Sequence, residues 1–196
     1  VAFRLPNTFR RLFAEGTFNA AFIPSYTSEK IKGKFQGKKF ADDVLTLLIL
    51  GLSAIVLLVE IFTPYVVYLI APGFANDVTK FELAVNFTRI TFPFLAFVSL
   101  SSFFAGILNS ENKFAAAAAA PIFLNLILIL SLSISYYFEL DIALNLSYGV
   151  SLAGLIQLIF LILFASKYYS PSLVFKKKIG KKVKFFIYKL LPSIFS

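Results

Sequence analysis

The chain begins with charged and polar side chains set into an otherwise apolar stretch, residues 1–29. They are Arg4, Asn7, Arg10, Arg11 and Glu15. A guanidinium group presents a planar fork of N–H donors that can bind a phosphate through two hydrogen bonds. Charge at membrane depth costs about 2.5 to 3.5 kcal/mol per residue, so such side chains usually face a protein interior or a water-filled cavity. These residue types therefore predict an anion-binding site.

Helical spacing divides these charges into two groups. The rotation of about 100° per residue places four side chains along one side of a helix: Asn7, Arg11, Glu15 and Phe18. Arg11 and Glu15 are spaced i, i+4 and can form an ion pair, although the order with arginine first is the weaker one. Arg10 lies about 60° from Asn7 and about 140° from Glu15, so this helix offers it no partner. One interpretation is that Arg10 is a receptor for an anion. The other is that Arg10 and Arg11 extend to the membrane–water interface, or pair with an acidic residue of another helix.

The composition indicates that lipid surrounds the elements that position these residues. The chain has 196 residues, of which 59% are hydrophobic and 15% charged, against about 25% charged residues in soluble domains. It has no Cys and no His, which excludes disulfides and thiolate metal sites and removes the usual proton shuttle at neutral pH. With no acidic cluster at membrane depth either, we predict no metal site, no cofactor and no enzymatic chemistry.

The apolar stretches predict an all-α, polytopic helical membrane protein, because a membrane-spanning helix needs about 20 apolar residues. The predicted spans are 1–29, 44–70, 85–110, 114–138 and 142–166, with another beginning at 185–196. Glu60 and Arg89 are expected near the membrane surface, and a role for either in lining a cavity is left open. The chain starts without Met and stops inside an apolar segment, so we expect an internal fragment of a longer protein.

Lysine and arginine are concentrated in alternate loops. Of the 19 positive residues that give the net charge of +9, twelve lie in the first and last loops, 27–43 and 167–184. The positive-inside rule places these two basic loops in the cytoplasm. Basic loops can also bind nucleic acid. The flanking spans instead favour membrane lipids as partners, with no nucleic acid.

The first segment contains a long and unusual series of residues: Ala2-Phe3-Arg4-Leu5-Pro6-Asn7, Arg10-Arg11-Leu12-Phe13-Ala14-Glu15-Gly16, Phe18 and Ala21-Phe22-Ile23-Pro24. This series resembles the MurJ (MviN) family of bacterial lipid II flippases in the multidrug/oligosaccharidyl-lipid/polysaccharide (MOP) exporter superfamily. Weaker matches follow in the expected order at Ala71-Pro72-Gly73-Phe74, Arg89-Ile90-Thr91-Phe92-Pro93 and Gly106-Ile107-Leu108-Asn109. The resemblance extends over essentially the whole chain.

The resemblance implies a transporter of about fourteen helices in two lobes around a cationic cavity that works by alternating access. Residues 1–196 would then be part of the N-terminal lobe, covering helices two to six and the start of seven. The family match gives Arg10 a role in binding the pyrophosphate of lipid II. Arg4 matches a basic position, while Asn7, Arg11 and Glu15 match the motif without so clear a role.

The resemblance also implies the bacterial inner membrane as location, lipid II as partner, and a monomeric transporter when the protein is complete. Two alternatives remain open at this point. One is another MOP exporter that carries a different lipid-linked polysaccharide or a drug, although the net positive charge of residues 1–29 is less typical of a drug exporter. The other is a membrane scaffold protein that recruits anionic partners through the lysines from Lys176 to Lys184.

Overall fold

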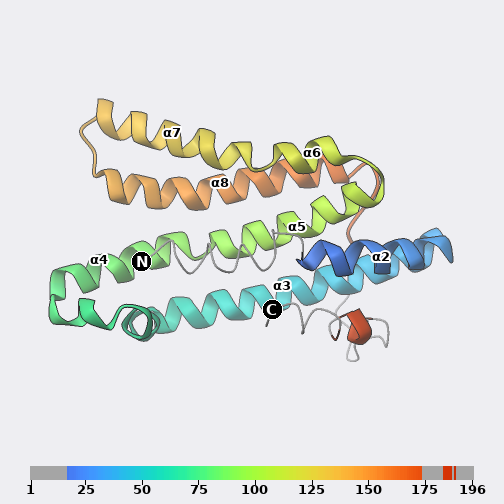
Figure 1. The fold of residues 1–196 in the computed structure, drawn as a ribbon, viewed down its shortest axis with the longest axis horizontal. Helices are drawn as coiled ribbons and strands as arrows, with labels where there is room; N and C mark the ends of the chain where they lie inside the picture. The colour runs from blue at the N-terminus through green and yellow to red at the C-terminus, as the bar shows by residue number, and fades with distance from the viewer. Residues whose placement is uncertain (1–16, 174–182, 187, 189–196) are drawn as a thin grey trace.

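The computed structural model describes residues 17–173, 183–186 and 188. Its elements, shown in Figure 1, are α2 (Thr17–Ile31), α3 (Lys34–Ile70), the short 3-10 helix η1 (Pro72–Asn76), α4 (Val78–Thr91), α5 (Phe94–Ser110), α6 (Phe114–Ala119), α7 (Ile122–Tyr137) and α8 (Ile142–Ala165). Within this described part, every element is helical. The expectation of an all-α fold is confirmed.

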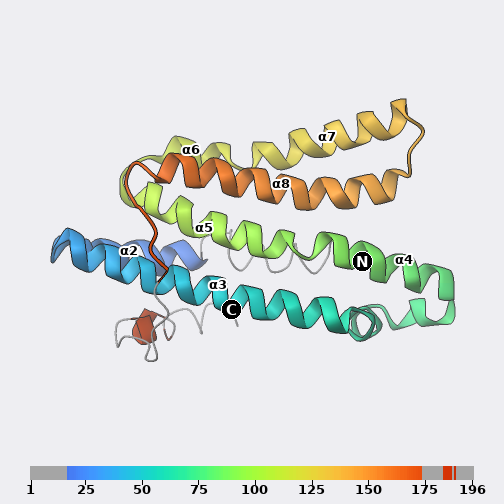
Figure 2. The same ribbon diagram turned by 180° about the vertical axis from the view of Figure 1, so that it is seen from behind.

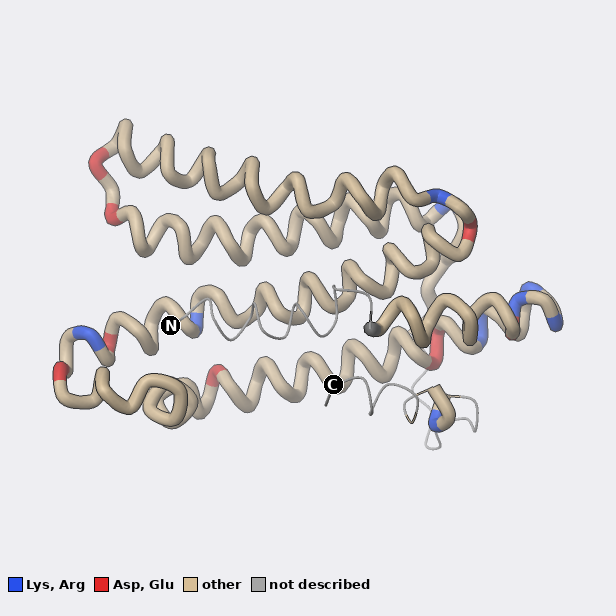
Figure 3. Tube along the Cα trace, in the orientation of Figure 1, with Lys and Arg blue, Asp and Glu red and all other residues tan. Residues whose placement is uncertain are grey.

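The helices lie side by side with α5 in a central position. Helix α5 packs against α8, which packs in turn against α7, while α2 and α3 contact α5 from the other side (Figures 1 and 2). The chain connections lie at two ends of this bundle. One end holds the α2–α3 turn, the α5–α6 turn and the segment after α8, and we call it the lysine-rich end (Figure 3). The opposite end holds η1 and the α7–α8 turn.

Four helical segments are long and apolar enough to cross a membrane: Lys34–Ile70, Val78–Ser110, Phe114–Tyr137 and Ile142–Ala165. The last two end within a residue of the ranges expected from hydrophobicity. The second begins at Val78 rather than at residue 85, because the Asp77 side chain caps the helix by accepting a hydrogen bond from the Lys80 backbone N–H. Residues 183–186 are helical, and the rest of the segment expected to begin a further span at 185–196 lies almost entirely outside the described residues.

The prediction of a loop over residues 27–43 is wrong. Helix α2 continues to Ile31 and α3 begins at Lys34, so the connection between them is a two-residue turn. Gly33 permits this turn, because its φ of 149° is a backbone conformation that other residues rarely adopt. An ion pair between Lys38 and Asp42 at i, i+4, with 2.6 Å between the nitrogen and oxygen, supports the first turns of α3. The high lysine content of residues 27–43 suggested a loop. Most of this segment is helical instead, and the ion pair between Lys38 and Asp42 stabilises that helix.

Prolines divide the long spans, and nearby hydroxyl groups satisfy the backbone there. Pro64 cannot donate to the carbonyl of Glu60, and α3 is kinked at Phe62. The Thr63 hydroxyl donates to that carbonyl at 3.0 Å. Where Pro93 separates α4 from α5, the Ser151 hydroxyl of α8 donates to the carbonyl of Ile90. These hydroxyl groups replace the missing backbone N–H donors. The replacement is needed because lipid offers no hydrogen bonds to backbone carbonyl groups.

Candidate functional site

The residues predicted to bind an anion lie outside the described residues. This applies to Arg4, Asn7, Arg10, Arg11 and Glu15, so their grouping around an anion stays a prediction. The structure does describe the continuation of the same chain segment, α2, and the contacts that hold it.

Aromatic side chains anchor α2 in the core. Phe18, Phe22 and Tyr26 recur at i, i+4 along one side of the helix and are at most 4% exposed. The rings of Phe18 and Phe22 stack with centroids 5.3 Å apart, and Phe22 contacts Phe40 of α3 and Phe103 of α5. Aromatic rings are stiff and bury large areas. Helix α2 is therefore held firmly against α3 and α5.

A glycine allows α2 to approach α5 closely. A Cβ atom added at Gly106 of α5 would lie 2.6 Å from the Asn19 Oδ1 atom and 2.8 Å from the Phe22 ring. Small residues at helix contacts are the common means of close packing in membranes, where burial of apolar surface provides little drive for helix association. The match of Gly106 to the family motif thus has a packing explanation.

A polar hollow lies beside Asn19, between α2, α5, α6 and α8. Its volume is about 390 Å³, and its polar lining includes Asn19, Ser101, Asn109 and Gln157. Within the described part of the chain, the Asn19 Oδ1 and Ser101 Oγ atoms are buried without a hydrogen-bond partner. Buried polar atoms normally have partners. The lining is neutral, so this hollow can offer hydrogen bonds to water or to a polar group but no charge to an anion.

Sequence reasoning missed this hollow. Its signal was available, because Asn19, Ser101 and Gln157 interrupt apolar spans. A single polar residue in a span is also common on a helix that binds nothing, and sequence spacing does not tell which polar residues on different helices meet.

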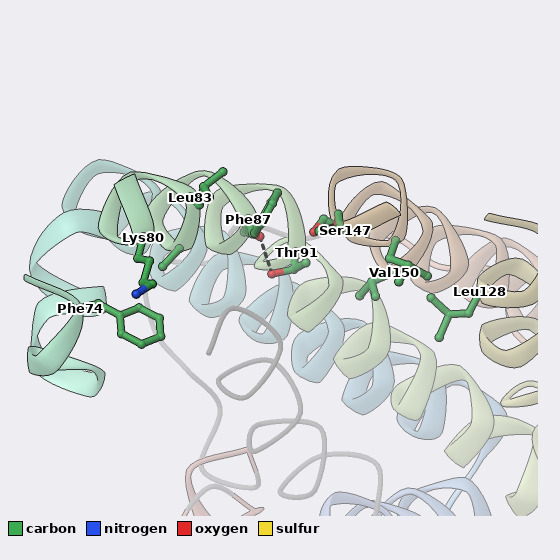
Figure 4. Close-up of a pocket in the computed structure, with 11 residues that line it drawn as sticks. Phe74, Lys80, Leu83, Phe87, Thr91, Leu128, Ser147 and Val150 are labelled. Atoms are coloured by element: carbon green, nitrogen blue, oxygen red, sulfur yellow. Dashed lines mark hydrogen bonds between the residues drawn. The ribbon is translucent and has the colours of Figure 1, made fainter. Parts of the chain in front are cut away.

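An apolar pocket lies near the opposite end of the bundle (Figure 4). Its volume is about 500 Å³, and the labelled lining residues are Phe74, Lys80, Leu83, Phe87, Thr91, Leu128, Ser147 and Val150. The Thr91 hydroxyl donates to the Phe87 carbonyl at 2.8 Å, so its proton is not available to a ligand in the pocket. Lys80 supplies the one charge among the lining residues. Such a pocket suits a hydrocarbon chain better than a charged group.

Glu60 and Arg89 lie close enough to interact electrostatically across α3 and α4. Glu60 is half-buried and its Oε1 atom is enclosed, whereas Arg89 is exposed. Neither residue lines one of the two cavities described above. The expected position of both near the membrane surface stays a prediction.

The fold and these cavities define a class of protein. The chain forms a multi-pass membrane bundle of apolar helices with charged ends, kinked spans and polar or apolar hollows between helices. Among the described residues, no group of His, Cys, Asp and Glu side chains could hold a metal ion. These features are those of a multi-pass helical membrane protein.

Comparisons with known proteins identify the family. A family model described as lipid II flippase MurJ matches residues 1–196. The probable lipid II flippase MurJ of Rhizobium meliloti (strain 1021) is 47% identical over 162 residues, which cover 80% of this chain and 30% of the relative. The corresponding protein of Rickettsia prowazekii (strain Madrid E) is 43% identical over 168 residues, covering 85% of this chain and 33% of the relative. The chain belongs to the MurJ family.

A solved structure agrees in fold. The structure named as lipid II flippase MurJ in an inward closed conformation superposes with a TM-score of 0.79 at 24% sequence identity, covering 99% of this chain and 39% of that one. The expectation of a MurJ-type membrane fold is therefore confirmed. The chain spans about a third of the length of the curated relatives described above. The division into a partial N-terminal lobe stays a prediction.

Proposed function

We propose that the protein translocates lipid II, the lipid-linked peptidoglycan precursor, across the bacterial inner membrane. The observation that carries this proposal is the match of the lipid II flippase family model to residues 1–196. Relatives at 47% and 43% identity are named probable lipid II flippase MurJ. The net positive charge of residues 1–29 supports an anionic substrate.

In this proposal, Arg10 holds the pyrophosphate of the headgroup in a cavity near the middle of the membrane. Arg4, Asn7, Arg11 and Glu15 belong to the same site, where an ion pair between Arg11 and Glu15 leaves Arg10 free for the substrate. Two lobes rock so that the cavity opens inward and then outward while the lipid tail stays in the membrane. No covalent bond is made or broken, so the protein acts as a transporter and not as an enzyme.

The aromatic anchoring of α2 supports this mechanism. Phe22 is fully buried against α3 and α5. In this proposal, α2, α3 and α5 therefore move together when substrate binds to the residues at the start of this segment. A lobe that rocks as a rigid body needs such a connection between ligand-binding residues and neighbouring helices.

The proposed transporter is monomeric.

The proposed orientation places the lysine-rich end of the bundle in the cytoplasm. The α2–α3 turn and the start of the segment 167–184 both lie at this end, and both carry lysines that the positive-inside rule assigns to the cytoplasmic side. An inside-negative potential favours outward movement of an anion by about 2.3 kcal/mol per charge for each 100 mV. The same potential can also return the empty cationic site inward.

The test is complementation of a strain depleted of its own lipid II flippase. The complete protein with Arg10→Ala should fail to restore growth while inserting into the membrane at normal levels. Lys113→Ala removes one positive charge from an exposed position in the α5–α6 turn and should restore growth fully, which controls for charge loss alone.

Normal growth with Arg10→Ala would remove Arg10 from the mechanism. Failure of the unchanged complete protein to rescue growth would favour a different lipid-linked substrate.

A further inference from the structure

A third cavity, with a different chemistry, opens at the lysine-rich end. Its volume is about 360 Å³, and it is lined by Tyr26, Lys30, Lys34, Lys38, Glu111, Lys167, Tyr168, Tyr169 and Ser170. These residues come from α2, α3, the α5–α6 turn and the segment after α8, which are distant in sequence. Four lysines face one glutamate in this lining, which leaves an excess of three positive charges. We call this cavity the lysine pocket.

Two of the four lysines are neutralised by the protein itself. The Lys30 ammonium group pairs with Glu111. The Lys38 ammonium group donates to Asp42 at 2.6 Å and to the Ser172 hydroxyl at 2.8 Å. Among the described residues, Lys34 and Lys167 have no ion-pair partner. The uncompensated charge of the lysine pocket is therefore concentrated on these two side chains.

Hydrogen bonds hold the part of the pocket wall around Tyr169, whereas Lys34 and Lys167 are exposed. Tyr169 is 4% exposed, and its hydroxyl donates to Asp42 at 2.6 Å. The backbone N–H of Ser172 donates to the same Oδ1 atom at 3.0 Å. Burial, together with the hydrogen bond to Asp42, raises the pKa of Tyr169 above its usual range, so this hydroxyl stays a donor. Asp42 thus ties the segment after α8 to α3 and holds Lys167 beside the lysines of α2 and α3.

Large apolar side chains flank the pocket lysines in sequence. Ile31 follows Lys30 and is 82% exposed, and Phe35 follows Lys34 and is 74% exposed. Exposed apolar groups next to lysines at the end of membrane-spanning helices are typical of insertion at the boundary between lipid headgroups and acyl chains. This arrangement favours a ligand that has both a phosphate and a hydrocarbon part.

We propose that the lysine pocket binds the phosphate group of an anionic membrane phospholipid, with Lys34 and Lys167 as its main charge partners. The hydroxyl groups of Tyr168 and Ser170 in the lining add hydrogen bonds to the phosphate oxygens, and Ile31 and Phe35 contact the acyl chains. The lining residues are different from the arginines proposed to hold the transported headgroup. A bound lipid there fastens the segment after α8 to the α2–α3 turn.

The first experiment measures binding of phosphatidylglycerol to the complete protein by native mass spectrometry in detergent. The double variant Lys34→Gln/Lys167→Gln should bind this lipid at least about tenfold more weakly, since it removes the charge-assisted hydrogen bonds that both lysines donate to the phosphate. The matched control is Lys39→Gln/Lys113→Gln, which removes the same charge from exposed positions at the same end of the bundle but outside the pocket. Its affinity should change less than about threefold.

Equal losses in the two double variants would mean general attraction of lipid to a basic surface and would overturn the proposal. A loss confined to the pocket variant supports it, provided that thermal unfolding without lipid is the same for both proteins. If the pocket variant is destabilised, Lys34→Arg/Lys167→Arg keeps the charge, and its retained binding supports the site while lost binding contradicts it.

A second experiment separates a lipid from a free phosphate. Inorganic phosphate at millimolar concentration should not displace phosphatidylglycerol, because it lacks the acyl chains that contact Ile31 and Phe35. Displacement would assign the pocket to a soluble phosphate compound and would overturn the lipid part of the proposal. Phosphatidylcholine, whose headgroup has no net charge, should bind at least about tenfold more weakly than phosphatidylglycerol.

Discussion

The two ends of the bundle use charged side chains in different ways. At the lysine-rich end, Asp42 accepts hydrogen bonds from Tyr169 and Ser172, and Lys30 pairs with Glu111, so charges join segments that are far apart in sequence. At the opposite end, Asp77 pairs with Lys80 three residues away, which lowers the pKa of Asp77. The lysine-rich end is thus fixed by contacts between elements, whereas the aspartates of the opposite end act within one helix.

This difference has a consequence for a transporter that changes shape. Contacts between elements must be broken if those elements separate, whereas contacts within a helix move with it. The lysine-rich end should therefore behave as one body during any rearrangement. The opposite end has a cavity of about 500 Å³ lined mainly by apolar side chains, and such a surface can change its contacts without losing hydrogen bonds.

The largest effect is expected from Asp42→Ala. Asp42 is 5% exposed, and its removal would leave the buried Tyr169 hydroxyl and the Lys38 ammonium group without their carboxylate. Leaving a buried partner unpaired should cost about 3 kcal/mol of unfolding free energy. The measurement is denaturant unfolding of the complete protein in detergent.

Asp42→Asn is the control for this prediction, because the amide keeps one acceptor oxygen and should lose only about 1 kcal/mol. A loss below 1 kcal/mol for Asp42→Ala would show that the lysine-rich end is not held together through this residue.

The position of the spans could be predicted from the sequence, while the contacts of Asp42 could not. Hydrophobic length alone placed α8 to within a residue, since membrane thickness fixes the length of a helix. Asp42 and its partners Tyr169 and Ser172 are about 130 residues apart in the chain. No local pattern indicates that they meet, and the lysines around Asp42 suggested a loop where α3 has already begun.

Some features of the candidate site could likewise be predicted from the sequence, and others could not. A motif with unusual charges, such as Arg10-Arg11 followed by Glu15, can be found from sequence because membrane spans rarely carry charge. The polar hollow beside Asn19 and the lysine pocket could not be found in this way, because each is assembled from side chains of several elements. Their residues are ordinary for their positions until the fold brings them together.

A second prediction concerns the helix contact beside the polar hollow. Gly106→Ala would place a methyl group within 3 Å of Asn19 and Phe22, and such overpacking should cost about 2 kcal/mol. Gly51→Ala is a matched control in α3, where an added Cβ would meet nothing within 4 Å. The control should be unchanged or slightly more stable, since alanine favours a helix over glycine.

Both glycine variants can be compared by thermal unfolding in the same detergent. Equal stability of the two would mean that α2 and α5 can separate without cost, and the rigid anchoring of α2 would then be wrong. A loss for Gly106→Ala alone supports the close contact that holds α2 to the bundle.

The smallest effect is expected at the opposite end, from Asp141→Ala. The Asp141 side chain caps α8 by accepting from the Leu144 backbone N–H at 2.8 Å, and loss of such a cap costs about 1 kcal/mol. Hydrogen exchange followed by mass spectrometry should show faster exchange in the first turn of α8 and no change elsewhere. Asp42→Ala should instead raise exchange both in α3 and in residues 169–172, because that carboxylate joins the two segments. If Asp141→Ala raised exchange at the lysine-rich end as well, the ends would be coupled through α8, and the contrast between contacts across elements and contacts within one helix would fail.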